Sequence, residues 1–136
     1  MEKMRINNSE FKKKLNKKIN IKEIYNYYGL VEQTGSIFFE CKSCSCFVAS
    51  AFSEVLVRDK NLKVIKNSGR KGFLQLISLL PSSYPGHSIL TEDIGEIVEK
   101  KNCDCGKYGT RFLVHGRSSQ SEVRGCSDIW LVKLTI

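Results

Sequence analysis

From residue 37 onward, the sequence is a succession of short apolar segments, each ended by a turn signal. Pro81 ends one such segment, and Asn67-Ser68-Gly69 is a typical turn sequence. Short apolar segments between turns are typical of strands joined by brief connections, which favours antiparallel pairing. We expect strands over residues 47–57, 62–65, 72–80, 94–99 and 111–115.

The amino-terminal region has a different pattern. Phe11, Leu15 and Ile19 recur every four residues with lysines between them, and Ser9 is a suitable N-cap, so we expect a short amphipathic helix. Residues 21–28 are rich in β-forming side chains and predict a strand. The expected fold class is therefore α+β, with an amphipathic helix followed by a mainly antiparallel β-sheet.

Composition limits the classes of protein to consider. A chain of 136 residues forms one domain with a modest core, and its longest apolar stretches, 73–80 and 129–136, are too short to span a bilayer. The sequence shows no export signal, so we expect a cytoplasmic protein. The net charge of +8 comes largely from lysines of the expected helix. A solvated helix face explains this charge more simply than a nucleic-acid-binding patch.

Three segments contain residue types suited to a nucleotide. Tyr28-Gly29-x-x-Glu32 supplies an aromatic ring for a base, a glycine for close backbone approach and a carboxylate for Mg²⁺. Asp93 can accept hydrogen bonds from ribose hydroxyls, and Arg117 can contact ribose or phosphate. Each segment alone has an ordinary alternative, namely a strand-to-loop transition, a turn aspartate or a surface ion pair.

The order of these segments resembles the adenylate-forming superfamily, and their wording is similar to that of the LuxE acyl-protein synthetases. The matching segments are residues 27–36, 83–95 and 124–128, and the resemblance runs from about Phe11 to Asp128. It implies an entering helix and linker over residues 1–24. It also implies that residues 25–136 correspond to the carboxyl-terminal part of an acyl-protein synthetase domain.

The resemblance implies a reaction and a set of site residues. A fatty acid or another carboxylic acid reacts with ATP to give an acyl adenylate. The acyl group then moves to a cysteine and onward to a partner such as a fatty-acid reductase in bioluminescence. The implied roles are adenine packing for Tyr28 beside Gly29, Mg²⁺ binding for Glu32, ribose binding for Asp93, nucleotide contact for Arg117, and acyl acceptance for Cys126. Without the family match, a free thiol is the simpler interpretation of Cys126.

Six cysteines without an export signal point to metal or thiol chemistry. They include two knuckles, Cys41-x2-Cys44-x-Cys46 and Cys103-x-Cys105, and thiolates at such spacing suit Zn²⁺. Related phenylacetate-CoA-ligase-like enzymes carry a structural zinc in these two regions. That resemblance implies Zn²⁺ held by Cys41, Cys46, Cys103 and Cys105, with Cys44 as the alternative ligand. The other interpretation is a set of reduced thiols without metal.

The sequence also departs from the family pattern. The phosphate-binding loop, rich in Ser, Thr and Gly, has no counterpart upstream of Tyr28, and Ser118-Ser119 replace the acidic residue that often follows Gly-Arg. We therefore expect little turnover from this chain alone. Two alternatives stay open. One is half of a split phenylacetate-CoA-ligase-like enzyme completed by a separate amino-terminal half. The other is a zinc-stabilised, non-catalytic binding module, with nucleic acid as a ligand only if the basic helix binds it.

Overall fold

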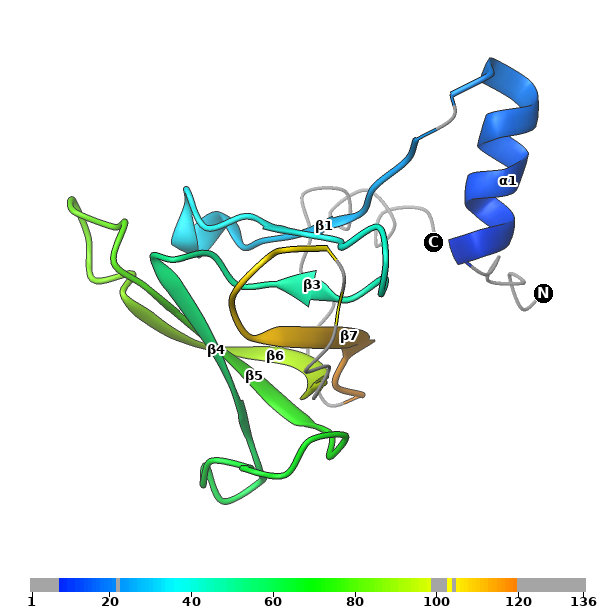
Figure 1. Ribbon diagram of the computed structural model, residues 1–136. Helices are drawn as coiled ribbons and strands as arrows, with labels where there is room; N and C mark the ends of the chain where they lie inside the picture. Colours follow the sequence, from blue (N-terminus) through cyan, green and yellow to red (C-terminus); the bar gives the residue numbers. More distant parts are fainter. Residues whose placement is uncertain (1–7, 22, 99–102, 104, 120–136) are drawn as a thin grey trace, which may run out of the picture.

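The computed structural model describes residues 8–21, 23–98, 103 and 105–119. After the helix α1 (Asn8–Ile19), the strands are β1 (Tyr27–Tyr28), β2 (Phe38–Phe39), β3 (Phe47–Val48), β4 (Ser53–Arg58), β5 (Gly72–Ser78), β6 (Ser88–Ile97) and β7 (Arg111–Arg117). A five-stranded sheet has the order β3-β7-β6-β5-β4, and β1 pairs with β2 in a second, two-stranded sheet (Figure 1). All of these pairings are antiparallel, which confirms the α+β class.

The core lies against one face of the larger sheet. Along β5, alternate side chains are buried, as expected for a strand with one face in the core. The buried cluster consists of Phe38, Ala49, Val55, Val57, Leu74, Leu76 and Phe112. Gly95 of β6 is required by close packing, because a Cβ atom there would lie 2.4 Å from the Leu113 carbonyl oxygen and 2.6 Å from Cδ2 of Leu74. The middle of the sheet is therefore tightly packed around β6.

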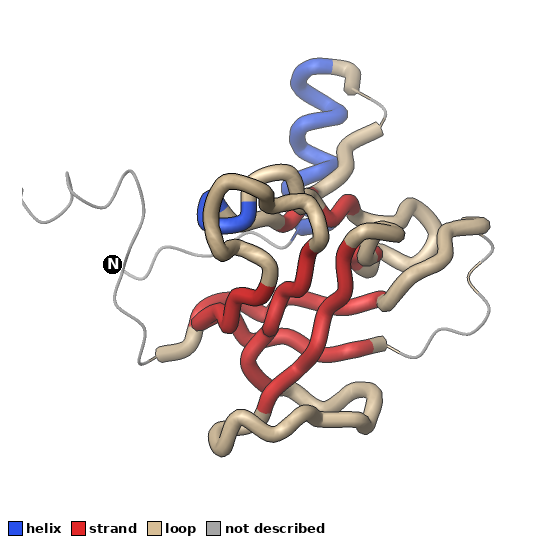
Figure 2. Tube along the Cα trace, turned by 90° about the vertical axis from the view of Figure 1, so that its left-hand side faces the viewer, coloured by secondary structure: helices blue, strands red, loops and turns tan. Residues whose placement is uncertain are grey.

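The helix α1 is attached differently from the strands. It ends where Asn20 adopts a left-handed conformation with φ of 53°, and the Asn20 N–H donates to the Asn16 carbonyl at 2.8 Å. None of its residues is buried, although its apolar side chains recur as predicted. An ion pair between Lys12 and the buried Glu40 links it to the rest of the molecule. Figure 2 shows α1 apart from the sheet rather than across one of its faces.

Several strand boundaries differ from the sequence-based prediction. Within residues 21–28, only Tyr27–Tyr28 forms a strand, because the Asn26 N–H donates to the Glu40 carboxylate at 2.9 Å instead of a neighbouring strand. The strand predicted over residues 47–57 is interrupted by a turn in which the Ser53 N–H donates to the Ser50 carbonyl at 3.1 Å. Residues 62–65 contribute only a single bridge from Val64 to Arg58. Strand β6 begins well before the predicted residue 94.

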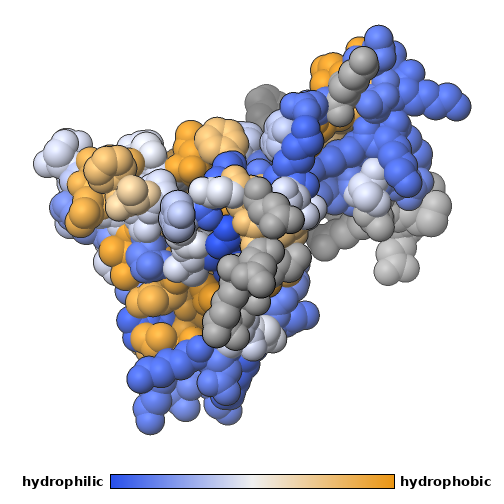
Figure 3. All heavy atoms as spheres, viewed as in Figure 1, coloured by the Kyte–Doolittle hydropathy of each residue, from blue (hydrophilic) through white to orange (hydrophobic). Residues whose placement is uncertain are grey.

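The surface separates into polar and apolar areas. Figure 3 shows hydrophilic residues over α1 and apolar residues on the opposite side of the view. Among the described residues, the exposed apolar side chains include Val31 and Leu79, which are 80% and 74% exposed. In the part of the chain that the structure describes, no helix has the length and apolar character needed to cross a membrane.

Candidate functional site

Asp93 lies in β6 and is supported from inside the sheet. Two residues earlier, the buried Thr91 donates its hydroxyl to the Leu74 carbonyl on β5 at 2.9 Å. The same hydroxyl oxygen accepts a hydrogen bond from the Asp93 N–H at 3.1 Å. Thr91 therefore fixes the Asp93 backbone at the place where the paired strands β6 and β7 change register between Ile94 and Gly95.

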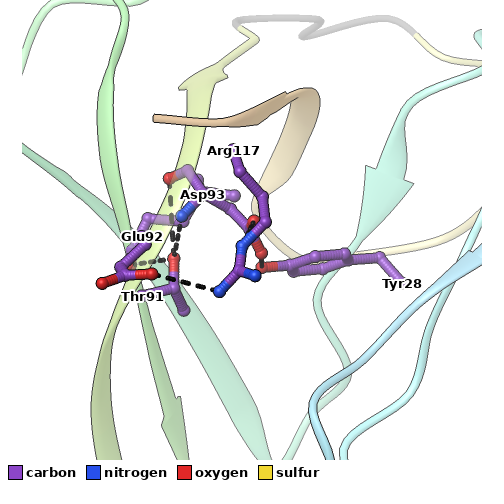
Figure 4. Close-up of polar contacts among 6 residues, drawn as sticks. Tyr28, Thr91, Glu92, Asp93 and Arg117 are labelled. Carbon is purple, nitrogen blue, oxygen red and sulfur yellow. Dashed lines mark hydrogen bonds and ion pairs between the residues drawn. The ribbon is translucent and has the colours of Figure 1, made fainter. Parts of the chain in front are cut away.

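Tyr28 brings its hydroxyl to the Asp93 carboxylate. The hydroxyl donates to Oδ2 of Asp93 at 2.7 Å, and Figure 4 shows the ring pointing toward this carboxylate. The ring itself packs among Phe38, Phe47 and Phe112, with centroids 6.2, 6.0 and 5.9 Å away. Burial, followed by the hydrogen bond to Asp93, raises the pKa of Tyr28 well above its ordinary value. Tyr28 thus remains a hydrogen-bond donor to Asp93 at neutral pH.

Arg117 reaches the same carboxylate from β7. It is the register partner of Asp93, and its Nε lies 3.9 Å from Oδ1 of Asp93. Its Nη2 lies 3.1 Å from Oε2 of Glu92, which projects beside it in Figure 4. The Arg117 and Glu92 side chains are 43% and 52% exposed, so this pair contributes little to stability. The Arg117 guanidinium is therefore held near the carboxylates of Glu92 and Asp93, and part of it remains accessible to solvent.

A cavity of about 590 Å³ joins these side chains to the turn that follows β1. That turn is the 3₁₀ helix η1 (Val31–Gln33), which carries the exposed Glu32. The cavity is lined by Gly29, Leu30, Val31, Glu32, Ile89, Leu90, Thr91, Glu92, Asp93 and Arg117. Four of the residues predicted to bind a nucleotide therefore line one cavity. Tyr28 does not line it but bonds to Asp93, which does. Cys126, the predicted acyl acceptor, lies outside the described residues.

Two contributors to this site were missed in the sequence. Thr91 belongs to the Thr-x-Asp segment, so its place two residues before Asp93 was a signal for a supporting role. Glu92 gave no such signal, because its contact with Arg117 depends on the register of β6 against β7. Only the pairing of the strands identifies Glu92 as the partner of Arg117.

The cysteines form a second cluster, away from the cavity. The sulfur atoms of Cys41, Cys44 and Cys103 all lie within 4.8 Å of one another, and those of Cys41 and Cys103 are 3.6 Å apart. This distance is far longer than a disulfide bond of about 2 Å. It is close to the ~3.8 Å expected between two sulfurs of a tetrahedral zinc site with Zn–S bonds of about 2.3 Å. The three thiols therefore fit a metal ion.

The remaining two described cysteines differ in their contacts. Cys105 is in hydrogen-bonding contact with Cys103, and Nη2 of Arg111 lies 3.5 Å from its sulfur. The Lys107 N–H and then Arg111 lower the pKa of the Cys105 thiol to about 6. The buried Cys46 instead directs its thiol to the Cys44 carbonyl at 3.4 Å. The structure thus groups Cys44, rather than Cys46, with Cys41 and Cys103.

Comparison with known families identifies the chain. A sequence model described as "Acyl-protein synthetase, LuxE" matches residues 1–135. The chain belongs to the LuxE acyl-protein synthetase family. The resemblance drawn from the three sequence segments is thereby confirmed, and membership of the LuxE family supports acyl-protein synthetase function in general terms. No curated protein and no solved structure matches the chain.

Proposed function

We propose that this LuxE-family chain carries the carboxyl-terminal part of an adenylate-forming site, which activates a fatty acid or another carboxylic acid with ATP. The observation that supports the proposal is the convergence of Gly29, Glu32, Asp93 and Arg117 on one cavity. These residues come from three separate segments of the sequence. A turn aspartate and an unrelated surface arginine would have no reason to meet there.

Each residue has a role that follows from its chemistry. Oδ2 of Asp93 accepts from Tyr28, so we assign Oδ1 of Asp93 to the ribose hydroxyls. The structure does not favour adenine packing by Tyr28, because its ring packs among phenylalanines and does not line the cavity. We therefore assign Tyr28 to holding Asp93 through its hydroxyl, and Arg117 to contacting the nucleotide in place of Glu92. Glu32 binds Mg²⁺, which would neutralise phosphate charge when bound.

The proposed reaction has two chemical steps, followed by transfer of the acyl group to a partner. A carboxylate oxygen of the acid attacks the α-phosphorus of ATP, pyrophosphate leaves, and an acyl adenylate forms. A cysteine thiolate then attacks the acyl carbonyl carbon, and AMP leaves with the bonding electrons to give a thioester. We assign this thiolate to Cys126. The acyl group passes from it to a thiol of an acyl-accepting protein, such as a fatty-acid reductase.

We also propose a structural Zn²⁺ at the cysteine cluster. Cys41, Cys44 and Cys103 would supply three thiolates, and Cys105 is the fourth ligand because it contacts Cys103. Four thiolates close the coordination shell, which leaves no position for a substrate. The metal would therefore join two distant turns of the chain rather than take part in acyl transfer. This assignment replaces Cys46 with Cys44 in the predicted ligand set.

We also propose how the chain is divided. Residues 1–24 act as an entering helix and linker, and residues 25–136 form the carboxyl-terminal part of the adenylate-forming domain. We assign no residue between 1 and 136 to a phosphate-binding loop, so the test of function adds an upstream segment that contains one.

ATP–pyrophosphate exchange with a panel of fatty acids tests this function. The chain should show little exchange alone and measurable exchange after addition of an upstream half that contains the phosphate-binding loop. Calorimetric titration with MgATP is the companion measurement, and Asp93→Ala should abolish binding to the mixture. A well-folded mixture that neither binds MgATP nor exchanges pyrophosphate would refute the proposal.

A non-catalytic, zinc-stabilised binding module is the second candidate, and the cysteine cluster is the observation that favours it. Its signature is a stoichiometric metal without nucleotide binding. Salt-dependent association with DNA would make the basic α1 helix the contact surface.

A further inference from the structure

Gln33 is the most buried polar side chain in an otherwise exposed turn. Its side chain is completely inaccessible, whereas the preceding Val31 and Glu32 of η1 are exposed. A buried amide is unfavourable unless its polar atoms are paired in the protein. An apolar side chain of similar length would fill the same space, so packing alone does not account for a glutamine here. The hydrogen bonds of its amide group indicate the reason.

The Gln33 amide connects η1 to the segment before β6. Its Nε2 donates to the Gly86 carbonyl at 2.8 Å and lies 3.4 Å from the Leu76 carbonyl of β5. The Gly86 carbonyl stands only three residues before Ile89, where the second side of the 590 Å³ cavity begins. Oε1 of Gln33 is buried without a partner among the described residues. The connection between η1 and the segment before β6 therefore depends on the Nε2 donor of Gln33.

A second contact runs parallel to this one. The Thr34 N–H donates to the Tyr84 hydroxyl at 3.0 Å, and the Thr34 hydroxyl lies 3.2 Å from the same oxygen. The Tyr84 ring covers Gly86 so closely that a Cβ atom there would lie 2.3 Å from Cε2 of the ring. Successive residues of one turn thus bind the same short loop. The loop is held by side-chain contacts as well as by its ends.

The contacts of Gln33 and Thr34 connect two parts of the chain that line the cavity. Two stretches of the chain, residues 29–32 and 89–93, line the cavity together with Arg117, and we call these two stretches its two sides. Gln33 follows Glu32 in the chain, and its partner Gly86 lies three residues before Ile89. The hydrogen bond between Gln33 and Gly86 therefore connects the chain next to Glu32 with the chain that leads to Asp93.

We propose that Gln33 is a positioning residue, which fixes Glu32 of η1 at a set distance from Asp93 of β6. The inference rests on the proposed function for its ligand, because Glu32 and Asp93 are there assigned to Mg²⁺ and ribose of one nucleotide. Gln33 itself does not line the cavity and touches no ligand. It acts through the placement of Glu32.

The variant Gln33→Met tests this role, because methionine keeps the length and volume of the side chain but has no amide donor. Gln75→Met is the matched control: Gln75 also bonds across strands, to Arg58 and Ser88, but does not line the cavity. Hydrogen exchange of backbone amides, measured by NMR on the ligand-free chain, should accelerate about tenfold in Gln33→Met at Thr34 and Ser36, whose N–H groups donate to the Tyr84 hydroxyl and the Gln33 carbonyl. Exchange in β7 should stay unchanged, and Gln75→Met should leave Thr34 and Ser36 unaffected.

Tyr84→Phe is a milder variant in case Gln33→Met does not fold. It removes the hydroxyl that accepts from the Thr34 N–H, so exchange should accelerate at Thr34 and, by a smaller factor, at Ser36. Unchanged exchange at Thr34 and Ser36 in the folded variants would overturn the proposal. An equal acceleration across all strands would overturn it as well, since it would indicate general destabilisation.

Nucleotide affinity separates this inference from the proposed function. With the chain and its upstream half, Gln33→Met and Glu32→Gln should both weaken MgATP binding by about tenfold and leave magnesium-free ATP binding unchanged. Equal weakening with and without Mg²⁺ would argue against the placement of Glu32 by Gln33. If the wild-type mixture binds no MgATP, the proposed function fails, while the exchange measurement still decides whether Gln33 holds the two sides together.

Discussion

The cavity around Asp93 and the cysteine cluster are held in place by different means. Around Asp93, strands supply most of the contacts: the Tyr28 hydroxyl bonds to the Asp93 carboxylate at 2.7 Å, and the Thr91 hydroxyl accepts from the Asp93 backbone N–H at 3.1 Å. Around Cys41, turns supply the residues, and the sulfur atoms of Cys41 and Cys103 lie 3.6 Å apart without a disulfide bond. Hydrogen bonds therefore define the first site without a ligand, whereas under the proposed zinc site a metal would join the parts of the second.

The largest expected effect is therefore the removal of metal from the cysteine cluster. A ligand present at about 1,000 times its dissociation constant stabilises the folded state by about 4 kcal/mol, and a chelator should remove this stabilisation. We expect about one zinc per chain by elemental analysis and a marked fall in Tm after chelation. Cys44→Ser should lose the metal, and Cys46→Ser should keep it. A metal content that depends on Cys46 but not on Cys44 would contradict the assigned ligands.

Phe112→Ala should produce the next largest effect, because this side chain connects the two regions. Its fully buried ring packs against Phe47, which follows the first cysteine turn, and against Tyr28, which bonds to Asp93. Truncation of a buried phenylalanine costs about 3–5 kcal/mol. Urea denaturation of the metal-loaded protein measures this loss. A change below about 1 kcal/mol would mean that the aromatic cluster does not support the fold as described.

The fold class could be predicted from the sequence, and so could four of the residues that line the cavity. Turn sequences and Pro81 interrupt the chain strongly enough to define most strands, and a buried face shows in the period of β5. Gly29, Glu32, Asp93 and Arg117 were singled out because the order of their segments resembles the LuxE family, since each segment alone had an ordinary alternative. Their convergence on one cavity needed the structure, because it depends on how β6 pairs with β7.

Other features could not be predicted from local sequence. The stretch 21–28 has the composition of a strand, but a side chain distant in sequence, Glu40, takes the hydrogen bond of Asn26. The spacing of Cys44 and Cys46 does not decide which thiol faces Cys103, since that depends on the left-handed conformation of Ser45 between them, with φ of 56°. Gln33 resembled any polar turn residue until its burial was known.

Tyr28→Phe tests whether the cavity is held by hydrogen bonds as well as by packing. It keeps the ring among the phenylalanines and removes only the hydroxyl that donates to Asp93. A hydrogen bond to a charged group contributes about 1.5–3 kcal/mol, and partial exposure of the pair should reduce this to about 1–2 kcal/mol. Urea denaturation at pH 7 measures the change in the free energy of unfolding. No change would show that the Tyr28 hydroxyl does not stabilise the site.

The Tyr28→Phe variant should also change how the stability of the protein depends on pH. The pKa of Tyr28 is raised in the folded state, so the unfolded chain loses this proton first, at about pH 10. The stabilisation is therefore complete below pH 10 and is lost as pH rises further. Tyr25, whose pKa the hydrogen bond to Glu23 also raises, contributes in the same direction. The fall of stability above pH 10 should be shallower in Tyr28→Phe than in wild type, and parallel curves would contradict the prediction.

Glu92→Gln has the smallest expected effect on stability, and it separates folding from binding within the cavity. The Glu92–Arg117 pair is half exposed, so its loss should change the free energy of unfolding by less than about 1 kcal/mol. Under the proposed function, Glu92 competes with the nucleotide for Arg117, and the variant should bind MgATP up to about fivefold more tightly, the equivalent of that energy. The gain should shrink at high salt, because exposed charges are screened. It should disappear in the Arg117→Ala background, because the competition requires Arg117. A gain that persists without Arg117 would show that Glu92 repels the nucleotide directly rather than by occupying its partner.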